Sequence, residues 1–204
     1  FGYAKTVDVA TYERNKEAAD AENKWIVNCI NTGKLCVFTN TGKMHQIKVL
    51  DLPYGKFRDK GQPIDNVSNY DSTQEMVVYM CDELQLRYAK LLFATKQGMI
   101  KKVKGNELQE DDELISVQVI TDDQHVVLQT KDGYFLRFSA QEVAEKKKAA
   151  VGVRGIKLRK NDELEQIYLF YEGTEHKISY GDRELTLNRL KVAKRDGTGT
   201  KARS

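Results

Sequence analysis

The sequence predicts an all-β chain of about four propeller-like blades. A phrase made of an apolar pair, Thr-x-x-Gly and a strand-forming run ending in basic residues recurs at Cys36–Lys48, Leu92–Val103 and Val127–Phe138. Recurrence at such spacings is typical of bladed β architectures. Proline cannot donate to a sheet ladder, and only two prolines occur in 204 residues. These observations favour paired strands throughout and a binding surface rather than one catalytic pocket.

The expected elements follow in chain order from this repeat. Residues Phe1–Val7 match the second half of a repeat, so the chain is expected to begin inside a unit, as a fragment of a longer subunit would. Residues Ala10–Asn23 form the segment expected to be a short helix or loop. A degenerate fourth repeat covers Lys177–Leu187, where Gly181-Asp182 is a hairpin turn signal.

Acidic segments open two further predicted strands, at Glu110–Val119 and Asn161–Leu169. Each unit is therefore expected to contain an acidic turn, a strand, a Thr-x-x-Gly hairpin and a basic strand, which makes about four strands. The repeat glycines Gly98 and Gly133 are closer together than the others. A loop omitted near residues 104–108 would explain this short spacing, and we treat it as a hypothesis. Residues 1–204 are expected to form a single domain.

The composition allows a folded core and a strongly ionic surface, because 40% of the residues are hydrophobic and 31% are charged, with a net charge of +3. No apolar run approaches the roughly 18 residues that a membrane span requires, and no signal-peptide pattern opens the chain. A cytoplasmic location without membrane contact is therefore expected. The three cysteines fit no zinc motif and are expected to be buried free thiols in a reducing compartment.

The basic residues are gathered in runs that predict a surface for a polyanion. One run spans residues 146–160 without an acid, a second spans 189–203 with one acid, and a third group lies at 101–104. Cations neutralise phosphates, and interleaved glycines let the main chain approach a duplex closely. A solvated face is the alternative for any single run. The candidate DNA-binding residues are Lys101, Lys102, Lys104, Arg137, Lys146, Lys147, Lys148, Arg154, Lys157, Arg159, Lys160, Arg189, Lys191, Lys194, Arg195, Lys201 and Arg203.

No catalytic constellation is visible in the sequence. The histidines His45, His125 and His176 stand alone in or beside predicted strands, and the nucleophile-elbow, zinc-protease and phosphate-loop motifs are absent. The acidic clusters at 110–113 and 161–165 precede strands, so turn chemistry is favoured over metal binding. Trp25 is expected to pack in a blade core. We therefore expect no catalytic residue, metal site or cofactor in this chain.

The segment Ala149–Leu158, which contains Gly-Val-Arg-Gly-Ile-Lys-Leu, resembles the C-terminal domain of the A subunit of bacterial type IIA topoisomerases. This is the DNA gyrase and topoisomerase IV family. Phe93–Lys102 and Phe38–Gly42 look like blade repeats of the same family, and the resemblance covers essentially the whole chain. It implies a β-pinwheel, in which propeller-like blades exchange strands with their neighbours and duplex DNA bends around a basic rim.

The resemblance also implies that the chemistry of the enzyme lies elsewhere. The DNA-cleaving tyrosine, the metal site and the ATPase of that family belong to other domains or to the partner subunit, so ATP and Mg²⁺ are expected only for the whole enzyme. The implied partners are duplex DNA, the ATPase-bearing B subunit, which is a separate chain, and the remainder of the A subunit. They would meet in the cytoplasm at the nucleoid. The chain would guide duplex segments during ATP-dependent strand passage.

One departure from the family pattern concerns the basic glycine-rich box that gyrase carries after its first blade strand. By register this loop is Tyr12–Glu22 here, which has no glycine and holds four acids against two bases. Lys194–Lys201 is a partial echo of the box at another blade. An acidic loop should repel phosphate, so topoisomerase IV-like relaxation or decatenation is favoured over gyrase-like supercoiling. The alternative from another functional class is a blade-type protein-interaction module with a charged rim.

Overall fold

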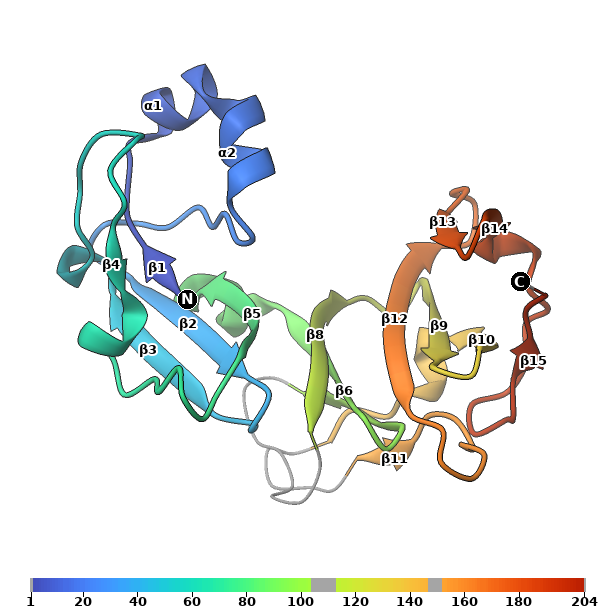
Figure 1. Ribbon diagram of the computed structural model, residues 1–204. Coiled ribbons are helices and arrows are strands. Elements are labelled where there is room, and N and C mark those ends of the chain that lie inside the picture. The colour runs from blue at the N-terminus through green and yellow to red at the C-terminus, as the bar shows by residue number, and fades with distance from the viewer. Residues whose placement is uncertain (1, 104–112, 147–151, 204) are drawn as a thin grey trace. The chain divides into compact units, whose positions relative to one another are not determined.

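The computed structural model describes residues 2–103, 113–146 and 152–203, and the chain divides into two compact units, Phe1–Tyr88 and Ala89–Ser204. Strands make up most of the regular structure of the described chain (Figure 1), which confirms the predicted all-β class. The loop hypothesised near residues 104–108 lies outside the described residues.

The first unit is built on an antiparallel sheet with the strand order β3-β2-β5. Its segment predicted as helix or loop forms two short helices, and Asp8 caps the first by accepting a hydrogen bond from the Thr11 N–H at 2.6 Å. The elements of this unit are β1 (Tyr3–Ala4), α1 (Val9–Arg14), α2 (Lys16–Glu22), β2 (Lys34–Thr39), β3 (Met44–Lys48), a 3₁₀ turn (Val49–Asp51), β4 (Gln62–Pro63), a 3₁₀ turn (Ile64–Asn66), β5 (Val77–Asp82) and α3 (Glu83–Tyr88).

The second unit contains two four-stranded sheets, with the orders β11-β7-β6-β8 and β12-β9-β10-β15, and the separate hairpin β13-β14. That hairpin turns at Gly181-Asp182, as the sequence predicts. The elements are β6 (Lys90–Thr95), β7 (Met99–Val103), β8 (Leu114–Ile120), β9 (Gln124–Thr130), β10 (Tyr134–Ser139), a 3₁₀ turn (Ala140–Glu142), β11 (Val153–Arg154), β12 (Leu164–Tyr171), β13 (Lys177–Tyr180), β14 (Arg183–Thr186), a 3₁₀ turn (Leu187–Arg189) and β15 (Thr200–Lys201).

The Thr-x-x-Gly phrase forms the turn of each repeat hairpin because its glycine adopts a left-handed backbone. The φ angle lies between +78° and +83° at Gly42, Gly98 and Gly133, a region that is sterically costly for other residues. In each turn the glycine N–H donates to the threonine carbonyl at 3.0 Å. The Thr95 hydroxyl also accepts from the Met99 N–H at 3.2 Å, so the phrase specifies its own turn locally.

Exchanged strands connect neighbouring repeats within each of the two units. The strand after each acidic turn pairs with the hairpin that precedes it, so β5 joins β2, β8 joins β6 and β12 joins β9. A short strand after three of the hairpins then returns to the preceding repeat, as β4 to β1, β11 to β7 and β15 to β10. This confirms the exchange that the family resemblance implies. The sequence predicts instead that the strand after each acidic turn belongs with the hairpin that follows it. The structure pairs this strand with the preceding hairpin, because the first strand of that hairpin has an open edge.

The core of the second unit joins its two sheets. One buried cluster includes Leu92 of β6, Ile100 of β7, and Leu128 and Phe138 of β9 and β10. Burial of each such side chain contributes about 1.5–3 kcal/mol. Ile156, which is 0% exposed, joins this cluster from the basic run at 146–160.

Gly155 allows the basic run to approach the sheets closely. Its N–H donates to the Gly98 carbonyl at 2.8 Å. A Cβ atom at Gly155 would meet Leu128 Cδ1 at 2.8 Å. In the Gly-Val-Arg-Gly-Ile-Lys-Leu phrase, Ile156 is therefore buried in the core, and Gly155 stands where a side chain would clash. The cations Arg154 and Lys157 of the phrase are exposed.

Candidate nucleic-acid interface

Three of the candidate DNA-binding residues are buried. Lys101, Lys102 and Arg137 are 5%, 4% and 5% exposed. Lys101 Nζ lies 5.7 Å from the ring centroid of Phe93 on the adjacent strand β6. The side chains of these cations therefore turn into the fold, and a surface for phosphate has to be sought among the other candidates.

Lys102 and Arg137 each fasten a strand to the 3₁₀ turn that follows the next hairpin. Lys102 Nζ donates to the Ala140 carbonyl at 3.3 Å. Arg137 Nη1 donates to the carbonyls of Asn188 and Leu190 at 2.7 and 3.1 Å. Both cations stand four residues after a turn glycine, so two of the repeats use this position to donate to carbonyls in or beside a 3₁₀ turn. The strands that end in basic residues thus serve the connection between blades.

The two long basic runs come together in the second unit. Arg154 on β11 forms an ion pair with Asp196, in which Nη2 and Oδ2 are 3.0 Å apart. Arg195 Nη1 donates to the Arg154 carbonyl at 2.6 Å, across 41 residues of sequence. The Lys157 N–H donates to the Gly197 carbonyl at 2.8 Å. Residues 154–159 therefore lie alongside residues 195–201.

Tyr134 of β10 gathers two further cations from these runs. It stands opposite Lys201 of β15 in the strand register. The Arg159 guanidinium carbon lies 3.4 Å from the Tyr134 ring centroid, and Lys201 Nζ lies 5.6 Å from it. Arg159 Nη1 also donates to the Thr198 carbonyl at 3.0 Å. We call Arg154, Lys157, Arg159, Arg195 and Lys201 the cationic surface.

The remaining candidates are distinguished by exposure. Arg195 is partly buried, and Lys104, Lys147 and Lys148 lie outside the described residues. The exposed candidates of the described chain are Lys146, Arg154, Lys157, Arg159, Lys160, Arg189, Lys191, Lys194, Lys201 and Arg203.

A hollow of about 700 Å³ lies beside the cationic surface, lined in part by Arg154, Lys157 and Arg159. Asp162 also lines it and is 5% exposed. Its Oδ1 accepts the N–H groups of Asp132 and Glu163 at 3.0 and 2.8 Å. The Asp162 carboxylate therefore accepts backbone N–H groups at a turn, which is the role that the sequence predicts for the acidic segment.

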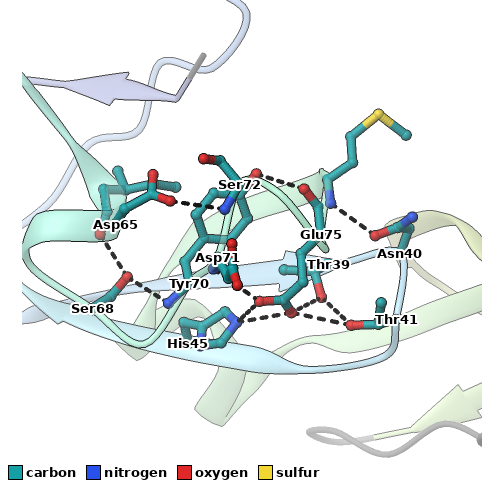
Figure 2. Close-up of polar contacts among 12 residues, drawn as sticks. Thr39, Asn40, Thr41, His45, Asp65, Ser68, Tyr70, Asp71, Ser72 and Glu75 are labelled. Atoms are coloured by element: carbon teal, nitrogen blue, oxygen red, sulfur yellow. Dashed lines mark hydrogen bonds and ion pairs between the residues drawn. The ribbon is translucent and has the colours of Figure 1, made fainter.

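The first unit contains a buried polar cluster around Glu75, which sequence reasoning missed. His45 Nε2 lies 3.0 Å from both carboxylate oxygens of Glu75. The hydroxyls of Thr39 and Thr41 donate to Oε1 at 2.8 and 3.1 Å, and the Asp71 N–H donates to Oε2 at 3.2 Å (Figure 2). Thr39, His45 and Glu75 are buried, so these side chains have little access to a substrate. The cluster is structural.

These contacts stabilise the ionised form of the Glu75 carboxylate. Burial disfavours its ionised form, but hydrogen bonds from His45, Thr39 and Asp71 outweigh burial and lower the pKa of Glu75 to about 2. The signal for this residue lies in its position. Glu75 precedes β5 as Asp162 precedes β12, so an alignment of the strand-leading acids would have found it.

The thiols follow the sequence prediction in part. Cys36 and Cys81 are buried and Cys29 is partly buried, and all three are free. Burial raises the pKa of Cys36 to about 11 and that of Cys81 to about 12, which makes these thiols poor nucleophiles. Within residues 2–103, 113–146 and 152–203, no group of three or more His, Cys, Asp or Glu side chains could hold a metal ion.

Trp25 is partly buried and packs edge-on against Tyr79 of β5, with ring centroids 6.0 Å apart. Packing thus occupies the ring that could otherwise stack on a base.

None of the described helices has the length and apolar character needed to cross a membrane.

Charge is distributed unequally between the two units. The first unit holds eleven basic and twelve acidic residues, whereas the second holds twenty-two basic and eighteen acidic residues. The whole excess of positive charge therefore belongs to the unit that carries the cationic surface. Long-range attraction of an anionic polymer would favour this unit.

Comparison with known proteins agrees with this architecture. Residues 89–110, 103–121 and 124–170 match the family described as DNA gyrase C-terminal domain, beta-propeller. The chain is 30% identical to the A subunit of DNA gyrase from Lawsonia intracellularis over 229 residues, an alignment that covers 97% of this chain and 28% of that relative. The chain thus spans less than a third of the length of this relative.

Solved structures share the fold. The crystal structure of the C-terminal domain of DNA topoisomerase IV matches with a TM-score of 0.81 and 23% identity, covering 98% of this chain and 69% of that one. The DNA gyrase A C-terminal domain matches with a TM-score of 0.63 and 21% identity, covering 85% and 61%. Together these matches confirm the recognition from sequence: the chain is similar to the C-terminal part of DNA gyrase A subunits, and it shares the fold of the C-terminal domains of DNA gyrase A and topoisomerase IV.

Proposed function

We propose that this chain is a non-catalytic DNA-binding and DNA-bending domain of a type IIA topoisomerase, carried by its A subunit. The observation that carries the proposal is the union of residues 154–159 and 195–201 into one cationic surface. The similarity to DNA gyrase A subunits supports it. Contacts to phosphates position a protein on DNA without reading its sequence, so binding should be weakly sequence-selective.

In the whole enzyme, we propose that the chain guides duplex segments during ATP-dependent strand passage. Its protein partners would be the ATPase-bearing B subunit, which is a separate chain, and the remainder of the A subunit, in the cytoplasm at the nucleoid. ATP and Mg²⁺ would act in those other parts.

A topoisomerase IV-like role is our proposal for the reaction. The position of the gyrase box, Tyr12–Glu22, falls on α1 and α2, and its four acids against two bases support weak attraction for DNA there. The test is the reconstituted enzyme with and without this chain. We expect relaxation and decatenation to depend on it, while strong introduction of negative supercoils would contradict the preference.

Direct binding tests the DNA proposal itself. If about six to ten phosphates are engaged, the affinity for a duplex should fall by ~10³–10⁵ between 50 and 200 mM salt. Fluorescence anisotropy with labelled duplexes measures this. A salt-insensitive affinity would contradict the mechanism.

Length dependence separates DNA bending from a protein-interaction module with a charged rim. Bending a site of 20–30 base pairs costs about 1–6 kcal/mol, which only a curved line of several contacts offsets. We expect tighter binding to a duplex of about 40 base pairs than to one of about 12, and energy transfer between its ends on binding. Equal affinity per phosphate with straight DNA would favour simple charge pairing and hence the interaction module.

A further inference from the structure

We propose that Tyr134 is a positioning residue for DNA binding, which holds Arg159 and Lys201 together so that they contact neighbouring phosphates as a unit. This inference rests on the proposed DNA-binding function and adds the residue that organises its cationic surface. It draws on the placement of two cations, from separate basic runs, around one ring.

The backbone places Tyr134 beside Lys201. The residue opens β10, directly after a Thr-x-x-Gly turn, and its N–H donates to the Thr130 hydroxyl at 3.2 Å. Tyr134 and Lys201 are register partners of β10 and β15. The ring and the lysine are thus neighbours because the exchanged strand returns to this edge.

Arg159 reaches the same ring from the segment after β11. Its guanidinium carbon lies 3.4 Å from the ring centroid, and one of its N–H groups is used by the Thr198 carbonyl at 3.0 Å. An arginine has five N–H donors in a fixed fork. The contacts therefore fix the guanidinium while leaving donors for a ligand.

The charges around the ring indicate an anion. Arg154 is already paired with Asp196, but no acid of the described chain forms an ion pair with Arg159 or Lys201. Two cations held near one another repel, and the negative face of an aromatic ring offsets part of that repulsion. A phosphate backbone would complete the compensation. Base stacking on Tyr134 is disfavoured because Arg159 occupies the space over the ring.

The test uses duplex binding by the chain in native and variant forms. In the native background, Tyr134→Phe keeps the ring and Tyr134→Val keeps a strand-forming residue without it. The same Tyr134→Val change is then made together with Arg159→Gln and Lys201→Gln, and compared with that double variant alone. Thermal unfolding of each form checks that the fold is retained.

At about 100 mM salt we expect Tyr134→Val to weaken binding by about 5-fold and Tyr134→Phe by less than about 2-fold, given the strength of such cation–π contacts. In the Arg159→Gln and Lys201→Gln background, Tyr134→Val should have almost no further effect. An equal loss in both backgrounds would overturn the inference, because the ring would then act by itself.

The remaining outcomes separate this inference from the proposed function. A native chain that binds no duplex would overturn the proposed function and the inference with it. A native chain that binds duplex in a salt-dependent way, with no loss in Tyr134→Val, would overturn the positioning role alone. The Arg159 Nε–H resonance gives a readout without DNA. It should be shifted by the ring in the native chain and in Tyr134→Phe, and not in Tyr134→Val.

Discussion

The position of a cation within the repeat decides whether it supports the fold or faces solvent. Arg137 and Lys102, four residues after a turn glycine, are buried and bind carbonyls of 3₁₀ turns. Lys160, in the run between blades, is exposed. The sequence predicts the same DNA-binding role for all three residues, whereas their different burial shows that only Lys160 is accessible to a ligand.

Arg137 provides a test of the structural role. We expect Arg137→Met to lower the free energy of unfolding by about 1–3 kcal/mol, because the carbonyls of Asn188 and Leu190 lose their donor. Urea unfolding measures this. The matched control is Lys160→Met at an exposed site, which should change stability by less than about 0.5 kcal/mol. A reduced salt slope of DNA binding in a fully folded Arg137→Met variant would instead assign Arg137 to phosphate.

Glu75 makes stability depend on pH in a defined direction. Its pKa is about 2 in the folded chain against an ordinary value of 4.5, so the unfolded chain binds the proton more readily. The stabilisation is present above pH 4.5 and is lost as the pH falls toward 2.

The Glu75→Gln variant isolates this contribution. It should be less stable than the native chain at pH 7, by about 1–3 kcal/mol, and the difference should shrink at about pH 3, between the two pKa values. Denaturant midpoints of both chains at the two pH values give the measurement. A gap that stays constant between them would show that another group is responsible.

At the scale of elements, the exchanged strands determine which segments must pack closely. The short strand β11 returns to β7, and this return brings Gly155 against Leu128 and Ile100. Helices and hairpins could form from local signals alone, such as the left-handed turn glycines. The return strands are two residues long, so their placement depends on what packs beside them.

Gly155→Ala tests that close approach. The new Cβ would lie 2.8 Å from Leu128 Cδ1 and 3.1 Å from Ile100 Cγ2, so we expect a loss of about 1–3 kcal/mol in the free energy of unfolding. The control is Gly173→Ala, since nothing lies within 4 Å of a Cβ at Gly173. Equal stability of the two variants in denaturant unfolding would show that the segment moves aside without cost.

At the scale of the whole molecule, charge is partitioned between the two units. The second unit carries the excess of basic residues and the cationic surface, while the first carries a slight excess of acids. Affinity for a phosphate backbone depends on how many cations engage it. The binding contribution of a lysine should therefore depend on which unit holds it.

Two matched triple variants test this partition. Replacing Lys157, Lys160 and Lys194 by Gln should lower the slope of log affinity against log salt by up to roughly 0.9 for each phosphate that is no longer neutralised. Replacing Lys16, Lys43 and Lys48, which are likewise exposed lysines of the first unit, should lower the slope by less than about 0.9 in total. Equal effects of the two triples in anisotropy titrations would contradict the partition.

The amino-acid sequence alone specifies the hairpins, their turns and the class of fold, because Thr-x-x-Gly sets a left-handed glycine and a hydrogen bond within four residues. The family resemblance supplied the exchange of strands. Tertiary packing was needed to establish which cations are buried, that His45 meets Glu75 across 30 residues, and that Arg195 meets Arg154 across 41. These contacts join segments that strand exchange brings together, and local sterics carry no information about such distant pairs.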